Sequence, residues 1–317
     1  MSGVAKQLEI EHNAQIPTWF HIGGRAARLA KPKSSADLIA CLEIDDEFRV
    51  LGEGANLLVD DEGVSGLVVS LQTDGFRGVE IDQTTGVIRA GAGVALPGLI
   101  NRCVKASLGG LEVLAGIPAT VGGAAIMNAG GAFGSMSDRV LAISAIDRAG
   151  RTHTYEGSQI DFGYRQSHLN HLIVTEVVFG LLPGDHDEIK ASRDRCMAYK
   201  AKSQPLADKS AGCVFKNPVL TQAIDSIGEA GERVGERVGA GMFIDRAGCK
   251  GMRVGGAMVS DVHANFITTT KEANARDVIA LIAQMQASVF DRFGVSLDRE
   301  LVIWSDKIDH ERIGGER

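Results

Sequence analysis

The chain has 317 residues, 44% hydrophobic and 23% charged, with a net charge of −7 at pH 7. This is ordinary globular composition, and an acidic balance argues against a nucleic-acid surface, which needs clustered Lys and Arg. No apolar run approaches the roughly 20 residues of a membrane span, and charges interrupt the N-terminal stretch, which is therefore not typical of a secretory signal.

The cysteines indicate a reducing compartment. There are five of them, widely spaced and without a C-x-x-C pair: Cys41, Cys103, Cys196, Cys213 and Cys249. An odd number at such spacing does not suit a disulfide framework. We therefore expect a cytoplasmic protein, which at this length has room for two or more lobes.

The first two thirds of the chain predict mainly strands with short helices. Ser34 and Ser35 precede an apolar stretch and predict a capped helix over 36–42, and Pro97 opens a second helix that runs through 107. Glycine or polar turns bound the strands. The expected strands are 48–50 and 66–70, the hairpin 79–82 with 87–90, the hairpin 141–147 with 152–155, and the long apolar strand 172–182.

The last third predicts a smaller α+β lobe. A charged helix from 187 to about 202 leads to Gln204-Pro205, where we place the lobe boundary, and a small sheet is expected from 255–258 and 265–268. Asn274 and Asp277 predict a capping box. The helix that follows, ended by Gly294, has an apolar stripe predicted to be core: Val278, Leu281, Ile282, Met285, Val289, Phe290 and Phe293.

The most informative segment runs from 109 to 134. Eight of its residues are glycine, and Ile117-Pro118, Thr120 and Asn128 lie among them. A flexible linker would be polar, whereas this run carries many apolar residues. Such a glycine cluster favours an ordered loop that brings backbone N–H groups against an anionic ligand.

A second glycine turn lies upstream, where a short strand enters Gly52-Glu53-Gly54-Ala55-Asn56 and a Leu-Leu-Val strand follows. Leu57 stands where a Rossmann fingerprint needs its third glycine, and no Gly-Lys-Ser/Thr of a P-loop is present. A strand–turn–strand unit can still hold a diphosphate through its backbone amides.

With the rest of the chain, these turns resemble one family, UDP-N-acetylenolpyruvoylglucosamine reductase, in its shorter form that lacks a tyrosine-bearing insertion. The resemblance covers nearly the whole chain, in order. Its motifs are Phe20-His21-Ile22-Gly23-Gly24, Gly52-x-Gly54-Ala55-Asn56-Leu57, Ala115-Gly116-Ile117-Pro118-x-Thr120-Val121-Gly122-Gly123, Met127-Asn128-Ala129-Gly130, Tyr164-Arg165-x-Ser167, Gln204-Pro205, Gly212-Cys213-Val214-Phe215-Lys216-Asn217-Pro218, Ala247-Gly248-x-Lys250-Gly251, Ser260-x-x-His263-Ala264-Asn265-Phe266 and Gly294-x-x-Leu297-x-x-Glu300.

The resemblance implies an α+β fold with a two-lobed FAD-binding domain of the vanillyl-alcohol-oxidase-like type and a smaller α+β substrate-binding lobe. The expected lobes are 1–75 with the tail 301–317, 76–205, and 206–300. It implies an FAD-dependent oxidoreductase of peptidoglycan precursor synthesis. NADPH is the reductant, and the enolpyruvyl group of a UDP-sugar is reduced to UDP-N-acetylmuramate.

The same resemblance implies roles for individual residues. Arg165 and Glu300 match the family's catalytic arginine and glutamate, and Cys213 stands where the family usually has a serine as proton donor. A thiol gives up a proton more readily than an alcohol, so we expect Cys213 to be the donor, with a buried, inert cysteine as the alternative. Substrate contact is expected of Tyr164, Lys216 and Asn217. FAD contact is expected of Gly52, Gly54, Ala55, Asn56, Leu57, Gly116, Ile117, Pro118, Thr120, Gly122, Gly123 and Asn128.

Some features have plainer interpretations. His263 is expected to be a buried hydrogen-bonding residue, and His168 with His171 lack a third ligand at suitable spacing, so no metal site is predicted. Residues 219–239 exceed the usual turn after Asn217-Pro218 and are interpreted as a mobile surface loop. Two other functions remain open: an FAD-dependent oxidase or dehydrogenase of another sugar or hydroxy acid, and a non-catalytic UDP-sugar-binding protein.

Overall fold

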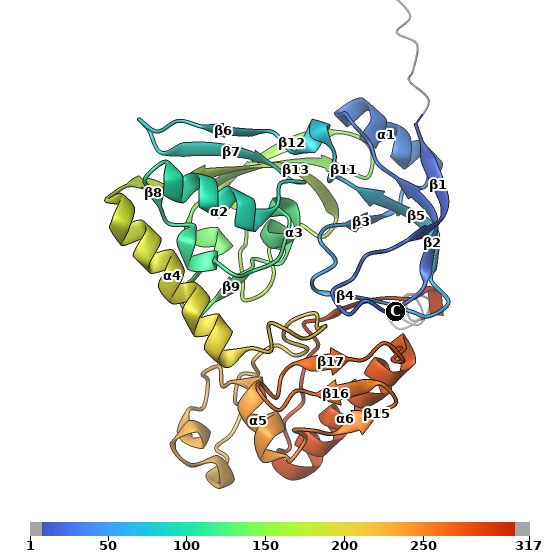
Figure 1. The fold of residues 1–317 in the computed structure, drawn as a ribbon, viewed down its shortest axis with the longest axis vertical. Coiled ribbons are helices and arrows are strands. Elements are labelled where there is room, and N and C mark those ends of the chain that lie inside the picture. The colour runs from blue at the N-terminus through green and yellow to red at the C-terminus, as the bar shows by residue number, and fades with distance from the viewer. Residues whose placement is uncertain (1–7, 308–317) are drawn as a thin grey trace, which may run out of the picture. The chain divides into compact units, whose positions relative to one another are not determined.

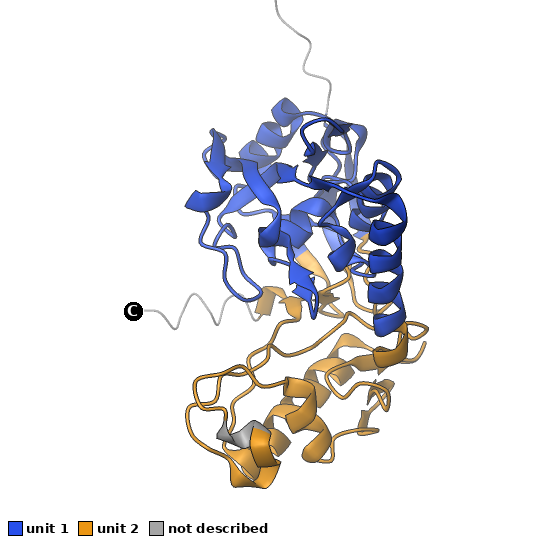
Figure 2. Ribbon diagram, turned by 90° about the vertical axis from the view of Figure 1, so that its left-hand side faces the viewer, with its two compact units in different colours: residues 1–14, 26–53, 65–200 blue, residues 15–25, 54–64, 201–317 orange. Residues whose placement is uncertain are grey.

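The structure, a computed structural model, describes residues 8–307, so the predicted tail beyond 307 and the first seven residues of the N-terminal stretch lie outside the described residues. The chain divides into two compact units (Figure 2). Unit 1 comprises residues 1–14, 26–53 and 65–200, and unit 2 comprises 15–25, 54–64 and 201–317. The three-lobe division remains a prediction.

A four-stranded sheet carries the first part of the chain, with the order β1-β2-β5-β3 (Figure 1). Its strands are β1 (Ile10–Gln15), β2 (Arg25–Ala30), β3 (Arg49–Leu51) and β5 (Val64–Ser70). The predicted capped helix is confirmed as α1 (Ser35–Ile44), because the Ser34 side chain accepts a hydrogen bond from the Asp37 N–H at 3.1 Å. The expected strands before and after the upstream glycine turn are also confirmed, as β3 and β4 (Leu57–Val59), but they pair in different sheets.

The larger sheet of unit 1 has five antiparallel strands in the order β12-β11-β13-β7-β6. It contains both predicted hairpins, with strands β6 (Val79–Ile81), β7 (Val87–Gly91), β11 (Val140–Asp147), β12 (Thr152–Glu156) and β13 (Leu172–Gly180). The apolar run 172–182 is therefore two strands, because the chain leaves the sheet at Leu181 and continues as β14 (Leu182–Pro183), paired with β8 (Leu108–Gly109).

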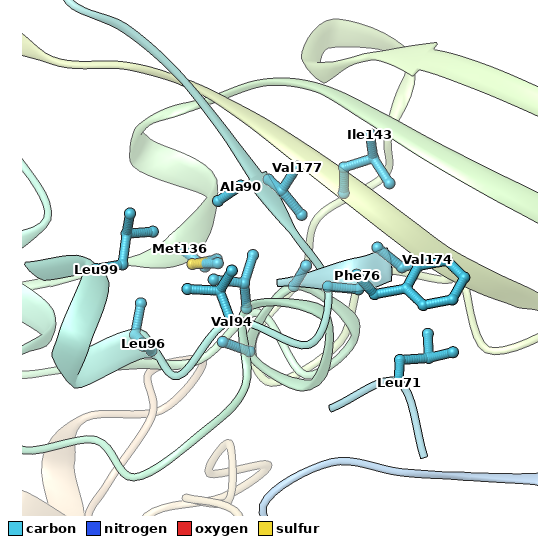
Figure 3. Close-up of a cluster of buried hydrophobic side chains, with 14 of the residues drawn as sticks. Leu71, Phe76, Ala90, Val94, Leu96, Leu99, Met136, Ile143, Val174 and Val177 are labelled. Atoms are coloured by element: carbon cyan, nitrogen blue, oxygen red, sulfur yellow. The ribbon is translucent and has the colours of Figure 1, made fainter. Parts of the chain in front are cut away.

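Two helices of unit 1, α2 (Leu96–Lys105) and α4 (His186–Ser203), begin and end close to the predicted bounds. A third helix, α3 (Val121–Ile126), lies inside the glycine segment, where the sequence predicted a loop. The other short elements of the unit are the turns η1 (Asp74–Phe76), η2 (Glu112–Leu114), η3 (Met136–Asp138) and η4 (Gly157–Gln159) and the small hairpin β9 (Gly130–Gly131) with β10 (Gly134–Ser135). Figure 3 shows how strand, helix and loop side chains such as Ala90, Leu96 and Met136 form one apolar core.

Unit 2 has its own core. The predicted small sheet is confirmed as β15 (Arg253–Val254), β16 (Ala257–Val259) and β17 (Ile267–Thr269), and α6 (Ala275–Phe293) contacts β15 and β16. A parallel pair, β4 with β18 (Val302–Trp304), and the helices α5 (Ala240–Arg246) and η5 (Asp225–Glu232) complete it.

The ends of α6 agree with the sequence. Asn274 and Asp277 form the predicted capping box, and Gly294 ends the helix in the left-handed conformation (φ +66°). The apolar stripe is core with one exception: Phe290 is 55% exposed, so its assignment to the core is wrong. Phe290 follows the buried Val289 directly, and neighbouring residues of a helix lie 100° apart around its axis. With Val289 facing the core, Phe290 therefore lies at the edge of the apolar stripe and faces solvent.

Residues 219–239 correct a second expectation. The side chains of Leu220, Ile224, Ile227 and Val238 are buried in the core of unit 2. The segment is therefore no purely surface loop, because these four apolar side chains attach it to the unit.

The thiols lie mostly inside. Cys41, Cys103, Cys196 and Cys249 are buried, Cys213 is half-buried, and none of the five is joined in a disulfide. Burial raises the pKa of Cys41 to about 11 and that of Cys103 to about 12. Such thiols are poor nucleophiles at neutral pH. Within residues 8–307, none of the helices combines the length and the apolar character needed to cross a membrane.

Candidate active site

Gly52, at the start of the upstream glycine turn, lies next to Thr120 of the long glycine segment, and both residues belong to unit 1. A Cβ added to Gly52 would lie 3.0 Å from the Thr120 Oγ1, so the bare backbone of Gly52 allows this approach. Thr120 is the N-cap of α3, and its Oγ1 accepts a hydrogen bond from the Gly123 N–H at 3.2 Å. The tertiary structure thus joins segments that are nearly 70 residues apart in the sequence.

Backbone N–H groups remain available at the upstream turn. Among residues 8–307, no hydrogen bond uses the N–H groups of Glu53, Gly54 or Ala55. Gly54 has φ +68°, and a Cβ there would overlap the carbonyl oxygen of Pro17, so only glycine fits. Successive outward N–H groups at such a turn form a concave site for anions.

Gly122 has a different reason to be glycine from the one the sequence suggested. Its N–H donates to the Ala92 carbonyl at 2.9 Å, and an added Cβ would lie 2.8 Å from the Ala92 Cβ. The missing side chain therefore lets α3 pack on the segment after β7. A bulky substitution at Gly122 would disturb this packing whether or not a ligand binds nearby.

Arg165 lies on a tight turn held from both sides. The Gly163 N–H donates to the Gln166 carbonyl at 3.0 Å, and Arg165 adopts φ +57°. The Asn128 Nδ2 donates to the Gly163 carbonyl at 2.9 Å, and the buried Ser167 hydroxyl donates to the Ile126 carbonyl at 2.8 Å. The turn is therefore fixed to Ile126 at the end of α3 and to Asn128, two residues beyond it.

Both ends of the Asn128 amide are engaged, since its Oδ1 also accepts from the Ser137 N–H at 3.0 Å. The structure thus shows Asn128 as a support of the Arg165 turn, and its contact with a cofactor stays a prediction. Tyr164 lies beside the guanidinium, with the Arg165 Cζ 5.2 Å from the centre of its ring. A ring in this position helps to orient the guanidinium.

Cys213 lies on a backbone segment of unit 2 that two others hold. The Val214 N–H donates to the Asn265 carbonyl at 2.8 Å, and the Val214 carbonyl accepts from the Glu300 N–H at 2.8 Å. Cys213 and Glu300 are therefore on neighbouring backbone segments, although the sequence separates them by almost 90 residues. This part of the predicted catalytic set is brought together within unit 2.

Asn56 joins the upstream glycine turn to the same place. Its Nδ2 donates to the Glu300 carbonyl at 3.0 Å, and its own carbonyl accepts from the Val302 N–H at 3.1 Å. Hydrogen bonds thus hold the predicted cofactor turn beside the backbone segment that carries the predicted catalytic glutamate, Glu300. The Asn56 side chain acts here as a positioning group.

The other predicted residues of unit 2 have defined contacts. The Asn217 Oδ1 accepts from the N–H of Ala240, the first residue of α5, at 3.0 Å, and the Lys216 N–H donates to the Asp298 carbonyl at 2.9 Å. His263 is half-buried, and its Nδ1 accepts from the Asn265 N–H at 3.2 Å. Burial lowers the pKa of His263.

Asn265 is a residue whose role the sequence did not reveal. It is 2% exposed, its Oδ1 accepts from the Phe215 N–H at 2.9 Å, and its Nδ2 donates to the Phe215 carbonyl at 2.8 Å. The side chain therefore acts as a strand partner for the segment that carries Cys213. The motif that contains Asn265 was recognised, but the pairing depends on a contact 50 residues away.

We expect Asn265→Ala to lower the free energy of unfolding by about 1–3 kcal/mol, because it leaves the buried N–H and carbonyl of Phe215 unpaired. Urea unfolding followed by circular dichroism measures the change. Asn170→Ala, at an exposed turn residue, is the control and should shift it by less than about 0.5 kcal/mol. Equal midpoints for the two variants would contradict the structural role of Asn265.

Comparison with known proteins first defines the class. Residues 26–156 match the family model described as FAD binding domain, which makes this chain an FAD-binding flavoprotein. Residues 204–304 match the model described as UDP-N-acetylenolpyruvoylglucosamine reductase, C-terminal domain. The second match begins at the predicted boundary, Gln204-Pro205.

Whole-chain relatives then define the family. The chain is 41% identical to the UDP-N-acetylenolpyruvoylglucosamine reductase of Moorella thermoacetica, with 96% of each chain covered. It is 38% identical to that of Syntrophobacter fumaroxidans, with 91% of this chain and 81% of the relative covered. The crystal structure of the Thermus caldophilus reductase matches with a TM-score of 0.76 at 36% identity, covering 94% of this chain and 99% of that one. The chain belongs to the UDP-N-acetylenolpyruvoylglucosamine reductase family.

These matches confirm the resemblance seen in the sequence and the α+β fold with an FAD-binding domain and a smaller C-terminal domain. The chain is accordingly an FAD-dependent oxidoreductase by family. The individual roles of Arg165, Cys213 and Glu300 stay predictions.

Proposed function

We propose that this protein catalyses the NADPH-dependent reduction of the enolpyruvyl group of UDP-N-acetyl-3-O-(1-carboxyvinyl)-glucosamine to UDP-N-acetylmuramate, a cytoplasmic step of peptidoglycan precursor synthesis. Family membership supports the reaction. The observation that carries the proposal is the hydrogen bond from the Glu300 N–H to the Val214 carbonyl, which sets a carboxylate residue beside the thiol residue Cys213.

The residues present fit FAD. The N–H groups of Glu53, Gly54 and Ala55, which no hydrogen bond among the described residues uses, are suited to the diphosphate, and Gly52 lies against Thr120 at the second glycine turn. When bound, FAD supplies the hydride, which NADPH has delivered to it. The contribution of this chain is to bind, orient and protonate the substrate.

Arg165 binds the substrate carboxylate and stabilises the negative charge that develops on it when hydride adds to the vinyl methylene carbon. A guanidinium suits this role because it stays charged and binds two oxygens at once. The anchoring of its turn by Asn128 and Ser167 supports this role, since electrostatic stabilisation depends on donors that are already in place.

Cys213 gives its Sγ proton to the carbon that carries the carboxylate, and Glu300 assists the proton movement. The net change is one hydride and one proton added across the carbon–carbon double bond, with no other group released. The thiolate left on Cys213 takes a proton from solvent before the next turnover.

Anaerobic stopped-flow absorbance of the purified protein with bound FAD tests the proposed function. NADPH should bleach the flavin absorbance, and the enolpyruvyl UDP-sugar should restore it without oxygen. Restoration by oxygen alone, or bleaching by a sugar in place of NADPH, would instead indicate an oxidase or dehydrogenase of another substrate. A UDP-sugar that binds without restoring the absorbance would indicate a binding protein.

A further inference from the structure

Lys200, a buried lysine near the end of α4, has no role in the proposed function. Lys200 is 7% exposed, although lysine is among the residues least often buried without a partner. Lys202, two residues further along the same helix, is exposed. The sequence pattern of the helix did not distinguish the two.

The Lys200 side chain lies on Gly116 of the long glycine segment. A Cβ added to Gly116 would lie 2.9 Å from the Lys200 Cδ and 3.7 Å from its Nζ. Gly116 also has φ +78°, which favours glycine. The Met197 sulfur lies 3.1 Å from the same Cβ position, so the bare backbone of Gly116 is what allows both side chains to pack against it.

Lys200 has no acidic partner among the described residues, and the charged group that acts on it, Arg165, is another cation. Within residues 8–307, no hydrogen bond or salt bridge joins Lys200 to a carboxylate. Burial is the main cause that lowers its pKa to about 8; the Cys196 thiol acts against the shift, and the charge of Arg165 adds to it. Lys200 and Arg165, both in unit 1, thus lie close enough for their charges to repel.

A buried lysine against the glycine segment, with the charge of Arg165 acting on it, suits the binding of an anion. We propose that Lys200 is a second substrate-binding cation, which together with Arg165 binds the carboxylate of the enolpyruvyl group. The proposal rests on the proposed function and adds one residue to it. Lys200 holds the substrate carboxylate in position, and the Arg165 guanidinium stabilises the negative charge that develops during hydride addition.

Another explanation is structural. Lys200 lies in the last turn of α4, where a cation stabilises the helix dipole. In that case its removal should lower the stability of the protein and leave ligand affinity alone. The proposed binding role requires the opposite, because removing an unpaired buried charge should stabilise the fold.

Equilibrium binding to the oxidised holoenzyme separates these possibilities. The variants are Lys200→Met, which keeps the stem against Gly116, and Lys202→Met as the control on the same helix. The ligands are UDP-N-acetylmuramate, which has the carboxylate, and UDP-N-acetylglucosamine, which has the same diphosphate and lacks it. Calorimetric titration gives the affinities, and thermal unfolding gives the stability.

We expect Lys200→Met to bind UDP-N-acetylmuramate on the order of 10- to 100-fold more weakly, as expected for the loss of a charged hydrogen bond. UDP-N-acetylglucosamine should bind as to the wild type, and the melting temperature should not fall. An equal loss of affinity for both ligands would indicate that Lys200 contacts the diphosphate, which both ligands have, and would overturn the proposal. Unchanged affinities would overturn it as well.

The proposed function can fail separately. If wild-type protein binds neither UDP-sugar and shows no turnover, the proposed function fails and the Lys200 proposal fails with it. If the wild type turns over and Lys200→Met binds UDP-N-acetylmuramate normally, only the Lys200 proposal fails.

The pH dependence is a further test. The groups that act on Lys200 are Arg165 and Cys196, and the pKa of Cys196 is itself raised by burial and by Glu112. Affinity for the carboxylate should therefore be highest below pH 8 and fall as the pH rises above 8, where Lys200 becomes neutral. Lys200→Arg should remove this fall. A wild-type affinity ratio between the two ligands that stays constant from pH 7 to 9.5 would contradict the proposal.

Discussion

Arg165→Lys is expected to lower turnover by about 10²- to 10³-fold, the effect typical of losing one donor to a developing negative charge. The rate at which NADPH bleaches the flavin should stay within about twofold, because the arginine acts on the substrate and takes no part in hydride delivery to FAD. Lysine keeps the positive charge but loses the planar group that binds two oxygens.

The Arg165→Lys substitution should leave the backbone of the turn unchanged. Arg165 has φ +57°, a conformation that costs lysine about as much as arginine, and the bonds that hold the turn come from Asn128 and Ser167. Arg151→Lys is a matched control, since Arg151 is an exposed arginine of the same unit paired with Asp147 at 2.8 Å. Anaerobic single-turnover measurements follow each half-reaction separately. If both half-reactions slow by the same factor in Arg165→Lys, the assigned role is wrong.

Cys213→Ala is expected to lose about 10²- to 10⁴-fold in turnover, the range that general acid catalysis contributes, while NADPH still bleaches the flavin normally. Cys213→Ser should remain active, because a hydroxyl occupies the same position and can deliver a proton. The substitutions leave the hydrogen bonds of Val214 to Asn265 and Glu300 in place, so the segment should keep its position.

The control for Cys213 is Cys249→Ala, a buried cysteine of the same unit. It should lower stability by loss of packing without changing turnover relative to bound FAD. A Cys213→Ala protein with turnover close to that of the wild type would falsify the proton-donor role and leave the inert-cysteine interpretation. A serine variant as slow as the alanine variant would show that the thiol acts in some other way.

The sequence by itself determined the elements whose signals are local. The Ser34 cap of α1, the Asn274–Asp277 capping box and the Gly294 end of α6 all depend on residues within one or two turns, and each is present in the structure. The hairpins followed from alternation and turn residues in the same way. The ordered motifs also determined the family, because an ordered set of matches along nearly the whole chain is specific to one family.

Only the tertiary structure decided what the individual residues do. The hydrogen bond from Asn56 to Glu300 spans 244 residues, and no local pattern predicts which side chains such a fold brings together. The reason for glycine at Gly122 is a close contact with Ala92, and at Gly116 it is the stem of Lys200. Burial likewise separates Lys200 from Lys202, two lysines of one helix. Secondary structure depends on short-range propensity and capping, whereas burial, charge repulsion and the partners of buried polar groups depend on packing between segments distant in the chain.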